Sequence, residues 1–233
     1  ASGVAVFPSD DAFTAVWQSL SGQRDQRTFS MAADAASEPA DVRSAVVVWQ
    51  SGAWQFTLKT AMGTAPVHLH IAGRHNVKNA LAASACALAA GVPLAAVAQG
   101  LIAFEPVKGR SRALVLHTPS HDITLVDDTY NANPDSMHAA IQVLAELPGP
   151  QLLVMGDMGE VGDQGPQFHA EAGALAHSAG IPLLFALGAQ SVHAASAYGS
   201  CARHFNDMGA LLDAVRQALP TVGSVLVKGS RFM

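Results

Sequence analysis

Blocks of hydrophobic and polar residues alternate along the chain in a pattern that predicts alternating strands and helices. The run VAVF at residues 4–7 predicts a short strand, and a polar turn separates it from a helix. The apolar face of that helix consists of Phe13, Val16, Trp17 and Leu20. Three β-rich runs follow, separated by Ser-Gly and Met-Gly-Thr turns, at residues 45–49, 54–60 and 67–71. They predict a small antiparallel meander.

An alanine-rich segment then changes the pattern from strand to helix. In GRHNVKNALAASACALAAG, Gly73 precedes a predicted helix that ends at Gly91. The segment PLAAVAQGLIAF predicts a second helix directly after it. Small side chains in both segments indicate that the two helices pack closely.

From Leu114 onward, predicted strands alternate with predicted helices. The apolar runs LVL, ITLV, QLLVM, PLLFAL and SVLV alternate with helical patterns near residues 134–147, 166–179, 189–197 and 207–218. This order predicts an α/β fold with βαβ units on a mostly parallel sheet. We place the domain boundary near EPVKGRSR, which gives domains of residues 1–108 and 109–233. Open parallel sheets bind ligands beyond the carboxyl ends of their strands.

Composition and charge narrow the classes of partner. The chain has 233 residues, of which 50% are hydrophobic, so it can bury a sizeable core. Its net charge of −5 and the lack of a basic run argue against binding to nucleic acid or to an acidic membrane surface. No apolar run has the length of a membrane span, and the first residues do not resemble a signal peptide. With two distant cysteines, Cys86 and Cys201, these features predict a cytoplasmic protein.

The segment DDTYNANPDSM carries more polar groups than a turn requires. Asn133 is expected to cap a helix with Pro134 in its first turn, so structure alone explains these two residues. The other polar residues are Asp127, Asp128, Tyr130 and Asn131, which follow a predicted strand. There a carboxylate can orient a cation or a ribose, and amides can bind a polar substrate. Any one of them would suit an ordinary turn, but their co-occurrence predicts a site.

Two further strand ends are candidates. The segment LVKGSRFM offers Lys228, Ser230 and Arg231, a set that suits a carboxylate or a phosphate, although a solvated chain end is the alternative. The segment VMGDMGEVG does not match the dinucleotide-binding fingerprint and could be a flexible loop.

Downstream of it, His169 lies inside a predicted helix, where a lone histidine is more often packed than catalytic.

Histidines and asparagines near residue 75 suggest a second site. Asn76 and Asn79 share a helix face and could present their amides to one planar base, whereas a simple helix cap would explain only one of them. His68, His70 and His75 make a metal site conceivable, but so short a pattern is weak evidence, and we predict no metal ligands. The phosphate-cradling sequence G-x-x-x-x-G-K-[ST] does not occur, so a complete phosphoryl-transfer site is not encoded in these residues.

Several motifs, taken together and in order, resemble the Mur ligase family: GRHNVKNALAA, VKGR, DDTYNANPDSM, GDMGEVG with His169 downstream, and VKGSR. The resemblance implies a three-domain enzyme that uses ATP and Mg²⁺ to convert the carboxylate of UDP-N-acetylmuramoyl-tripeptide into an acyl phosphate. The amine of D-alanyl-D-alanine would then attack this acyl phosphate. The enzyme would catalyse the reaction by electrostatic stabilisation and by positioning the reactants. Residues 1–108 would be the C-terminal part of the central ATP-binding domain, and residues 109–233 the Rossmann-like C-terminal domain.

The resemblance also implies roles for the residues that match these motifs. Asn76 and Asn79 would hold the adenine side of the nucleotide, and His75 belongs to the same cofactor-binding motif. Arg110 would contact the phosphates and Asp128 the ribose. The residues expected to face the dipeptide and the reacting centre are Tyr130, Asn131, Asn133, Lys228, Ser230 and Arg231. The expected catalytic set is Asp128, Arg110 and Lys228.

Parts of the family pattern do not occur in this sequence. The UDP-binding domain, the glycine-lysine phosphate loop, the magnesium ligands and a modified lysine would precede residue 1, and the helix expected after KGSR would follow Met233. Pro8 and Ser9 stand where relatives often carry an asparagine. We therefore expect a monomeric fragment, inactive alone, whose Mg²⁺ ligands lie mainly elsewhere. Two alternatives stay open: a stand-alone ligand-binding module without catalysis, and solvated loops without any ligand.

Overall fold

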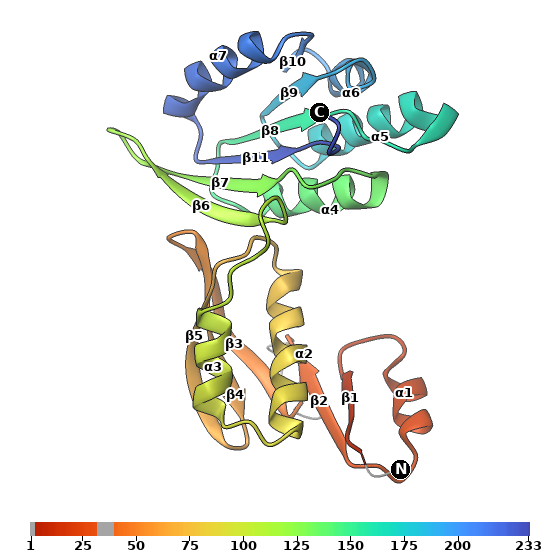
Figure 1. Ribbon diagram of the computed structural model, residues 1–233, viewed down its shortest axis with the longest axis vertical. Coiled ribbons are helices and arrows are strands. Elements are labelled where there is room, and N and C mark those ends of the chain that lie inside the picture. The colour runs from red at the N-terminus through yellow and green to blue at the C-terminus, as the bar shows by residue number, and fades with distance from the viewer. Residues whose placement is uncertain (1–2, 32–39) are drawn as a thin grey trace. The chain divides into compact units, whose positions relative to one another are not determined.

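The chain folds into two compact units (Figure 1), seen in a computed structural model that describes residues 3–31 and 40–233. The N-terminal unit is Ala1–His70 with Arg74–Glu105, and the C-terminal unit is Ile71–Gly73 with Pro106–Met233. Each unit contains a β-sheet with helices packed against it. This is the α/β class that the hydrophobic pattern predicts.

The N-terminal unit is built on a mixed sheet. Its strands are β1 (Ala5–Pro8), β2 (Gln26–Ser30), β3 (Val42–Gln50), β4 (Ala53–Thr60) and β5 (Gly63–Leu69). Within the described residues the sheet order is β1-β2-β3-β4-β5, with β1, β2 and β3 parallel and β3, β4 and β5 antiparallel. The predicted meander is confirmed. The strand β2 was not predicted, because its sequence QRTFS has no apolar run.

Helices α1 (Thr14–Ser21), α2 (His75–Ala89) and α3 (Leu94–Ile102) complete this unit. The core lies between α2 and the sheet, where Leu58, Val67 and Leu81 are fully buried. The predicted helix at α1 forms, but its apolar face is not a core face. Phe13 and Leu20 are 61% and 73% exposed, and Ser21 is the buried residue of α1. Periodicity alone does not show whether another segment covers an apolar face.

The C-terminal unit contains β6 (Arg112–His117), β7 (Asp122–Asp128), β8 (Gln151–Gly156), β9 (Leu183–Leu187), β10 (Ala202–Phe205) and β11 (Ser224–Lys228). Its helices are α4 (Pro134–Ala145), α5 (Gly165–Ser178), α6 (Val192–Tyr198) and α7 (Met208–Ala218), with short 3-10 turns at Gly162–Gln164 and Leu219–Thr221. Among the described residues the sheet order is β10-β9-β8-β11-β7-β6. All neighbouring strands are parallel except β6 and β7, as predicted for a mostly parallel sheet.

The strand order determines which loops meet. The last strand, β11, lies between β7 and β8, with Lys228 in register with both Asp128 and Met155. The carboxyl ends of β7, β8, β9 and β11 therefore lie at one edge of the sheet (Figure 1). On one face of the sheet, Leu152 and Val225 pack with Leu211 of α7 in a buried apolar cluster. The short edge strand β10 was not predicted, because its sequence ARHF is half charged or polar.

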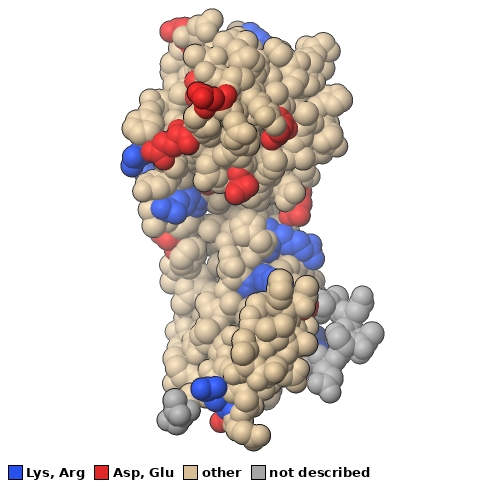
Figure 2. Space-filling model, turned by 90° about the vertical axis from the view of Figure 1, so that its right-hand side faces the viewer, with Lys and Arg blue, Asp and Glu red and all other residues tan. Residues whose placement is uncertain are grey.

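No helix within residues 3–31 and 40–233 is long and apolar enough to cross a membrane. On the face of the molecule shown in Figure 2, Lys and Arg side chains are interspersed with Asp and Glu among uncharged residues. The described residues on this face form no extended basic surface.

Candidate functional site

A buried ion pair lies at the carboxyl ends of β7 and β11. The Nζ of Lys228 donates a 2.6 Å hydrogen bond to Oδ2 of Asp128 and a 2.8 Å hydrogen bond to the backbone carbonyl of Asn131. The Lys228 side chain is 3% exposed and that of Asp128 is 15% exposed. These two acceptors compensate the Lys228 side chain for the loss of water. The structure thus brings together two predicted catalytic residues and one predicted substrate residue.

The second carboxylate oxygen of Asp128 binds the segment that leads into β6. Oδ1 of Asp128 accepts hydrogen bonds from the backbone N–H of Ser111 at 2.8 Å and from its hydroxyl at 3.2 Å. Asp128 therefore links Lys228 to Ser111 through its two oxygens. Sequence reasoning missed Ser111, although it follows the VKGR motif directly.

The neighbouring carboxylate, Asp127, fixes the other part of the same segment. Its Oδ2 accepts from the backbone N–H of Gly109 at 3.2 Å, and its Oδ1 accepts from the hydroxyl of Thr129 at 2.6 Å. The carbonyl of Gly109 in turn accepts from the backbone N–H of Tyr130 at 2.9 Å. The two adjacent acids of the DDTYNANP motif therefore join the end of β7 to residues 109–111.

Gly109 occupies a position that other residues tolerate poorly. Its φ is +78°, and a Cβ built on it would lie 2.8 Å from the backbone nitrogen of Tyr130. The left-handed conformation and the close approach both favour glycine. The glycine of VKGR is thereby explained by backbone geometry.

Arg110 projects from this fixed segment towards solvent. Its guanidinium carbon lies 4.2 Å from the centroid of the Tyr130 ring, in a cation–π contact. Arg110 is exposed, and Tyr130 is 50% exposed. Within the described residues, the guanidinium of Arg110 takes part in no ion pair or hydrogen bond. Its donors are available for an anion.

Asn133 begins α4 as a helix cap. Its Oδ1 accepts from the backbone N–H of Ser136 at 2.8 Å, and its own backbone N–H donates to the hydroxyl of Ser136 at 3.1 Å. This reciprocal arrangement is a capping box, with Pro134 in the first turn. The predicted capping role is confirmed, and a role toward substrate stays a prediction.

The loop after β8 is held from two sides. The carbonyl of Asp157 accepts from the backbone N–H of Ser230 at 3.0 Å, and its carboxylate accepts from the backbone N–H groups of Gln190 and Ser191. Ser230 is buried, whereas Arg231 is exposed and lies 3.8 Å from Glu160. So exposed an ion pair contributes little stability. Of the three polar residues in VKGSR, Lys228 and Ser230 belong to the sheet edge and Arg231 lies at the surface.

His169 is fully buried and holds the same loop. Its Nε2 accepts from the backbone N–H of Met158 at 2.9 Å, so its Nδ1–H donates to the carbonyl of Gly165 at 2.7 Å. Both ring nitrogens are occupied by backbone groups. His169 is therefore a packed side chain, as the sequence predicts, and not an accessible catalyst.

The second predicted site lies in the N-terminal unit, at the start of α2. Nδ2 of Asn79 donates to Oδ1 of Asn76 at 3.1 Å, on the face where the sequence places the pair. Neither residue caps the helix, because the N-cap is Arg74 and its side chain makes no capping hydrogen bond. His75 is exposed in the first turn. The simple-cap alternative for the two asparagines is thus wrong.

A neighbouring ion pair, missed in the sequence, fixes this end of α2. The Nζ of Lys78 lies 2.8 Å from Oδ1 of Asp10, which follows β1. Oδ2 of Asp10 accepts from the hydroxyl of Ser30 and the backbone N–H of Met31. Burial raises the pKa of Asp10, but the hydrogen bonds from Lys78, Met31 and Ser30 outweigh it, so the pKa lies below its ordinary value. Asp10 therefore joins the ends of β1 and β2 to α2.

The histidines considered as metal ligands do not form a site. Among the residues that the structure describes, no group of three or more His, Cys, Asp or Glu side chains is arranged to hold a metal ion. His68 and His70 are exposed at the end of β5.

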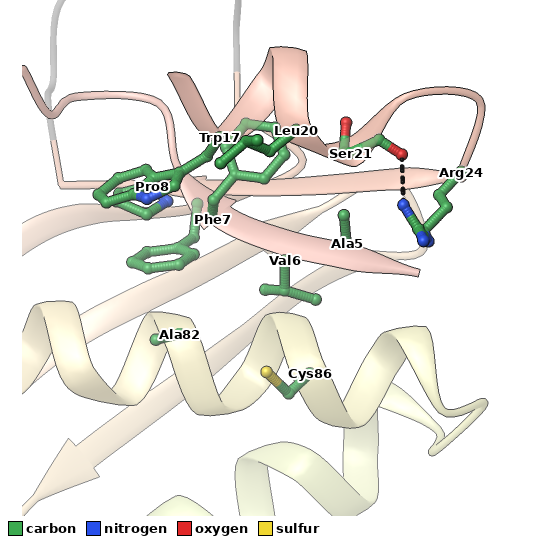
Figure 3. Close-up of a pocket in the computed structure, with 11 residues that line it drawn as sticks. Ala5, Val6, Phe7, Pro8, Trp17, Leu20, Ser21, Arg24, Ala82 and Cys86 are labelled. Atoms are coloured by element: carbon green, nitrogen blue, oxygen red, sulfur yellow. Dashed lines mark hydrogen bonds between the residues drawn. The ribbon is translucent and has the colours of Figure 1, made fainter. Parts of the chain in front are cut away.

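An apolar cavity of about 550 Å³ lies between β1, α1 and α2 (Figure 3). Phe7, Trp17 and Leu20 line it from one side, and Ala82 and Cys86 face them from α2. At its edge the Arg24 guanidinium donates to the carbonyl of Ser21 at 3.0 Å. The lining suits an apolar group and offers no set of polar residues for catalysis.

A smaller cavity of about 240 Å³ adjoins the buried ion pair. Its walls are mostly apolar side chains from α7 and from the ends of β8, β9 and β11. Its polar lining residues are Thr129, Lys228 and Ser230. The candidate site of the C-terminal unit therefore combines a fixed cation with an apolar wall.

Two protein-family models match the chain. Residues 111–231 match the model described as Mur ligase, glutamate ligase domain. Residues 1–87 match the model described as Mur ligase middle domain. The two matches lie in the C-terminal and N-terminal halves of the sequence, respectively.

Individual relatives match over the same range. UDP-N-acetylmuramoyl-tripeptide–D-alanyl-D-alanine ligase of Escherichia coli (strain K12) is 38% identical over 232 residues, which are 99% of this chain and 50% of that protein. The Haemophilus influenzae protein of the same name is 37% identical over 184 residues, which are 76% of this chain and 39% of that protein. A crystal structure of MurF from Acinetobacter baumannii is similar with a TM-score of 0.73 and 34% identity, covering 99% of this chain and 49% of that chain. This chain spans about half the length of the E. coli and A. baumannii proteins.

Proposed function

This chain belongs to the Mur ligase family, and we propose that it serves in an ATP-dependent ligase that joins D-alanyl-D-alanine to UDP-N-acetylmuramoyl-tripeptide. The observation that carries the proposal is the buried pair of Lys228 and Asp128, fixed beside the carbonyl of Asn131 at the carboxyl ends of parallel strands. Ligands of open α/β sheets bind at such edges. The names of the E. coli and H. influenzae relatives support the choice of substrates.

The chain's residues would act mainly by charge and position. Lys228 and Arg110 place two cations at one edge of the C-terminal unit, where they would stabilise negative charge on the reacting groups. Asp128 would keep Lys228 in place and, through its remaining exposure, approach the nucleotide ribose. Ser230 and the apolar wall of the smaller cavity would bound the space for the dipeptide.

Each of the two units offers groups that suit part of a nucleotide. In the N-terminal unit the amides of Asn76 and Asn79 suit an adenine edge. In the C-terminal unit the guanidinium of Arg110, which has no hydrogen bond or ion pair within the described residues, suits a phosphate group. Bound ATP would supply the phosphoryl group that activates the tripeptide carboxylate. The described residues contain no cluster of acidic or histidine ligands suited to Mg²⁺, so we assign no magnesium site to them.

We also propose that residues 1–108 belong to the central ATP-binding domain and residues 109–233 to the C-terminal Rossmann-like domain. The family matches at residues 1–87 and 111–231 support this division. The reaction would belong to peptidoglycan precursor synthesis in the cytoplasm, carried out by a monomeric enzyme.

A hybrid ligase tests the proposal directly. Residues 1–233 would replace the matching half of the E. coli ligase, and phosphate release would be measured with ATP, UDP-N-acetylmuramoyl-tripeptide and D-alanyl-D-alanine. We expect release that requires both substrates and falls about 100-fold or more in Lys228→Met, as when an oriented charge is lost at a transition state. The matched control is Lys108→Met, an exposed lysine two residues before Arg110, which should keep activity. A folded hybrid that binds ATP but shows no dipeptide-dependent release would refute the proposal.

A further inference from the structure

We propose that Asp127 and Tyr130 are positioning residues that hold the guanidinium of Arg110 ready for a phosphate group. The inference rests on the proposed function, in which Arg110 contacts the nucleotide phosphates. It gives Tyr130 a role on the phosphate side of the site instead of the dipeptide contact expected from the resemblance.

The first step is the fixed backbone on each side of Arg110. Gly109 donates its N–H to Asp127 and accepts from the N–H of Tyr130, while Ser111 donates its N–H to Asp128. The residues before and after Arg110 are therefore both attached to the end of β7, and Gly109 is also attached to Tyr130 in the loop that follows it. An exposed arginine on a fixed backbone loses less conformational freedom on binding an anion than an arginine on a mobile loop does.

The second step is the way in which the guanidinium itself is held. The Tyr130 ring lies under the guanidinium carbon at 4.2 Å. Within the described residues the N–H groups of this guanidinium make no hydrogen bond or ion pair, and such groups form the paired hydrogen bonds to phosphate oxygens. The ring contact thus holds Arg110 without engaging its donors in hydrogen bonds.

The third step is that the two nearby carboxylates are already occupied. Asp127 accepts from Gly109 and Thr129, and Asp128 accepts from Ser111 and Lys228. In the described part of the chain, neither acid forms an ion pair with Arg110. A carboxylate bound to Arg110 would compete with an incoming phosphate, and these donor contacts keep both acids engaged elsewhere.

The test uses the whole 233-residue chain and inorganic pyrophosphate as the probe. The Nε–Hε resonance of Arg110 would be followed by NMR during a pyrophosphate titration. We expect it to shift, and we expect Tyr130→Leu to weaken pyrophosphate binding about two- to five-fold, the range of an exposed cation–π contact. Tyr130→Phe keeps the ring and should retain the wild-type dissociation constant. Asp127→Asn weakens the hydrogen bond that holds the N–H of Gly109, because an amide oxygen is a weaker acceptor than a carboxylate and an amide N–H₂ cannot accept at all. This variant should weaken pyrophosphate binding by a similar factor.

Arg203 provides an internal control in the same spectra. Its guanidinium also makes cation–π contacts, at 5.4 Å from the Phe185 ring and 5.1 Å from the Phe205 ring, but it lies on β10 at the other edge of the sheet from β6. Its Nε–Hε resonance should not respond to pyrophosphate, and Arg203→Met should leave the dissociation constant unchanged.

Three results would overturn the inference. The Arg110 resonance could stay unmoved by pyrophosphate, or wild type and Tyr130→Leu could have equal dissociation constants. The third is a response of Arg110 to D-alanyl-D-alanine in place of pyrophosphate, which would contradict its phosphate-side role. Because this binding test needs no turnover, its failure is separate from failure of the proposed ligase activity, which the hybrid enzyme reports.

Discussion

The ammonium group of Lys228 lies 2.6 Å from the carboxylate of Asp128, although the two residues are 100 positions apart in the sequence. Their strands, β11 and β7, are neighbours in the sheet, and the register places the two residues side by side. The pair also fixes Asn131 through its backbone carbonyl. Stability and the candidate site therefore depend on the same contact.

Lys228→Met should destabilise the C-terminal unit by roughly 3 kcal/mol, because it leaves the partly buried Asp128 without its cation. This loss of unfolding free energy is measured by urea unfolding, in which the amide NMR signals of β7 and β11 report the folded fraction. The exposed Lys108→Met is the matched control and should unfold like the wild type. Equal unfolding free energies for Lys228→Met and wild type would show that the pair contributes nothing.

Gly173→Ala should destabilise the contact between α5 and α6. A Cβ at Gly173 would lie 2.1 Å from the carbonyl oxygen of Ala194, which is backbone and cannot move aside easily. The expected loss is about 3 kcal/mol in the free energy of unfolding, measured by urea denaturation of the C-terminal unit. The control is Gly100→Ala in α3, where a Cβ meets nothing within 4 Å. There the better helix propensity of alanine should stabilise the N-terminal unit by up to about 1 kcal/mol.

Asn133→Ala should remove the cap of α4 and lower the free energy of unfolding by about 1 kcal/mol, whereas Asn133→Ser should retain most of it. Asn131→Ala is the neighbouring control, because Asn131 contacts Lys228 only through its backbone carbonyl. Urea unfolding of the three variants makes the comparison. If Asn133→Ala unfolds like Asn131→Ala, the capping box does not stabilise the helix.

Asp10→Asn should change how the stability of the N-terminal unit depends on pH. The folded-state pKa of Asp10 lies below its ordinary value of 3.8, so its carboxylate stabilises the fold above that value. This contribution is lost as the pH falls through the lowered folded-state pKa. The difference in unfolding free energy between wild type and Asp10→Asn should therefore be largest above about pH 5 and shrink toward pH 3.

Tryptophan fluorescence is the suitable probe for this pH series, because Trp17, Trp49 and Trp54 all lie in the N-terminal unit. Asp11→Asn serves as the control, since its side chain keeps an oxygen for the N–H of Phe13. A constant difference between wild type and Asp10→Asn from pH 3 to pH 6 would contradict the lowered pKa.

Features set by neighbouring residues were predictable. The cap at Asn133 followed from a polar residue before Pro134 and an apolar helical stripe, and the packed state of His169 followed from its place inside a helix. In contrast, β2 and β10 were not predicted, because short strands with charged residues show little of the hydrophobic pattern from which strands are predicted. Their place in a sheet depends on the neighbouring strand with which they pair.

The sequence by itself determined the alternation of strands and helices, the meander, the mostly parallel sheet, the capping of α4 and the set of polar strand ends. These features depend on spacing along the chain, over which side-chain periodicity and backbone hydrogen bonding act. Only the tertiary structure decided that β11 enters between β7 and β8, that Asp128 binds both Lys228 and Ser111, and that the Tyr130 ring contacts Arg110. It also decided that the apolar face of α1 is exposed. Contacts between residues far apart in the sequence depend on strand order and on which surfaces cover one another, and no local pattern specifies either.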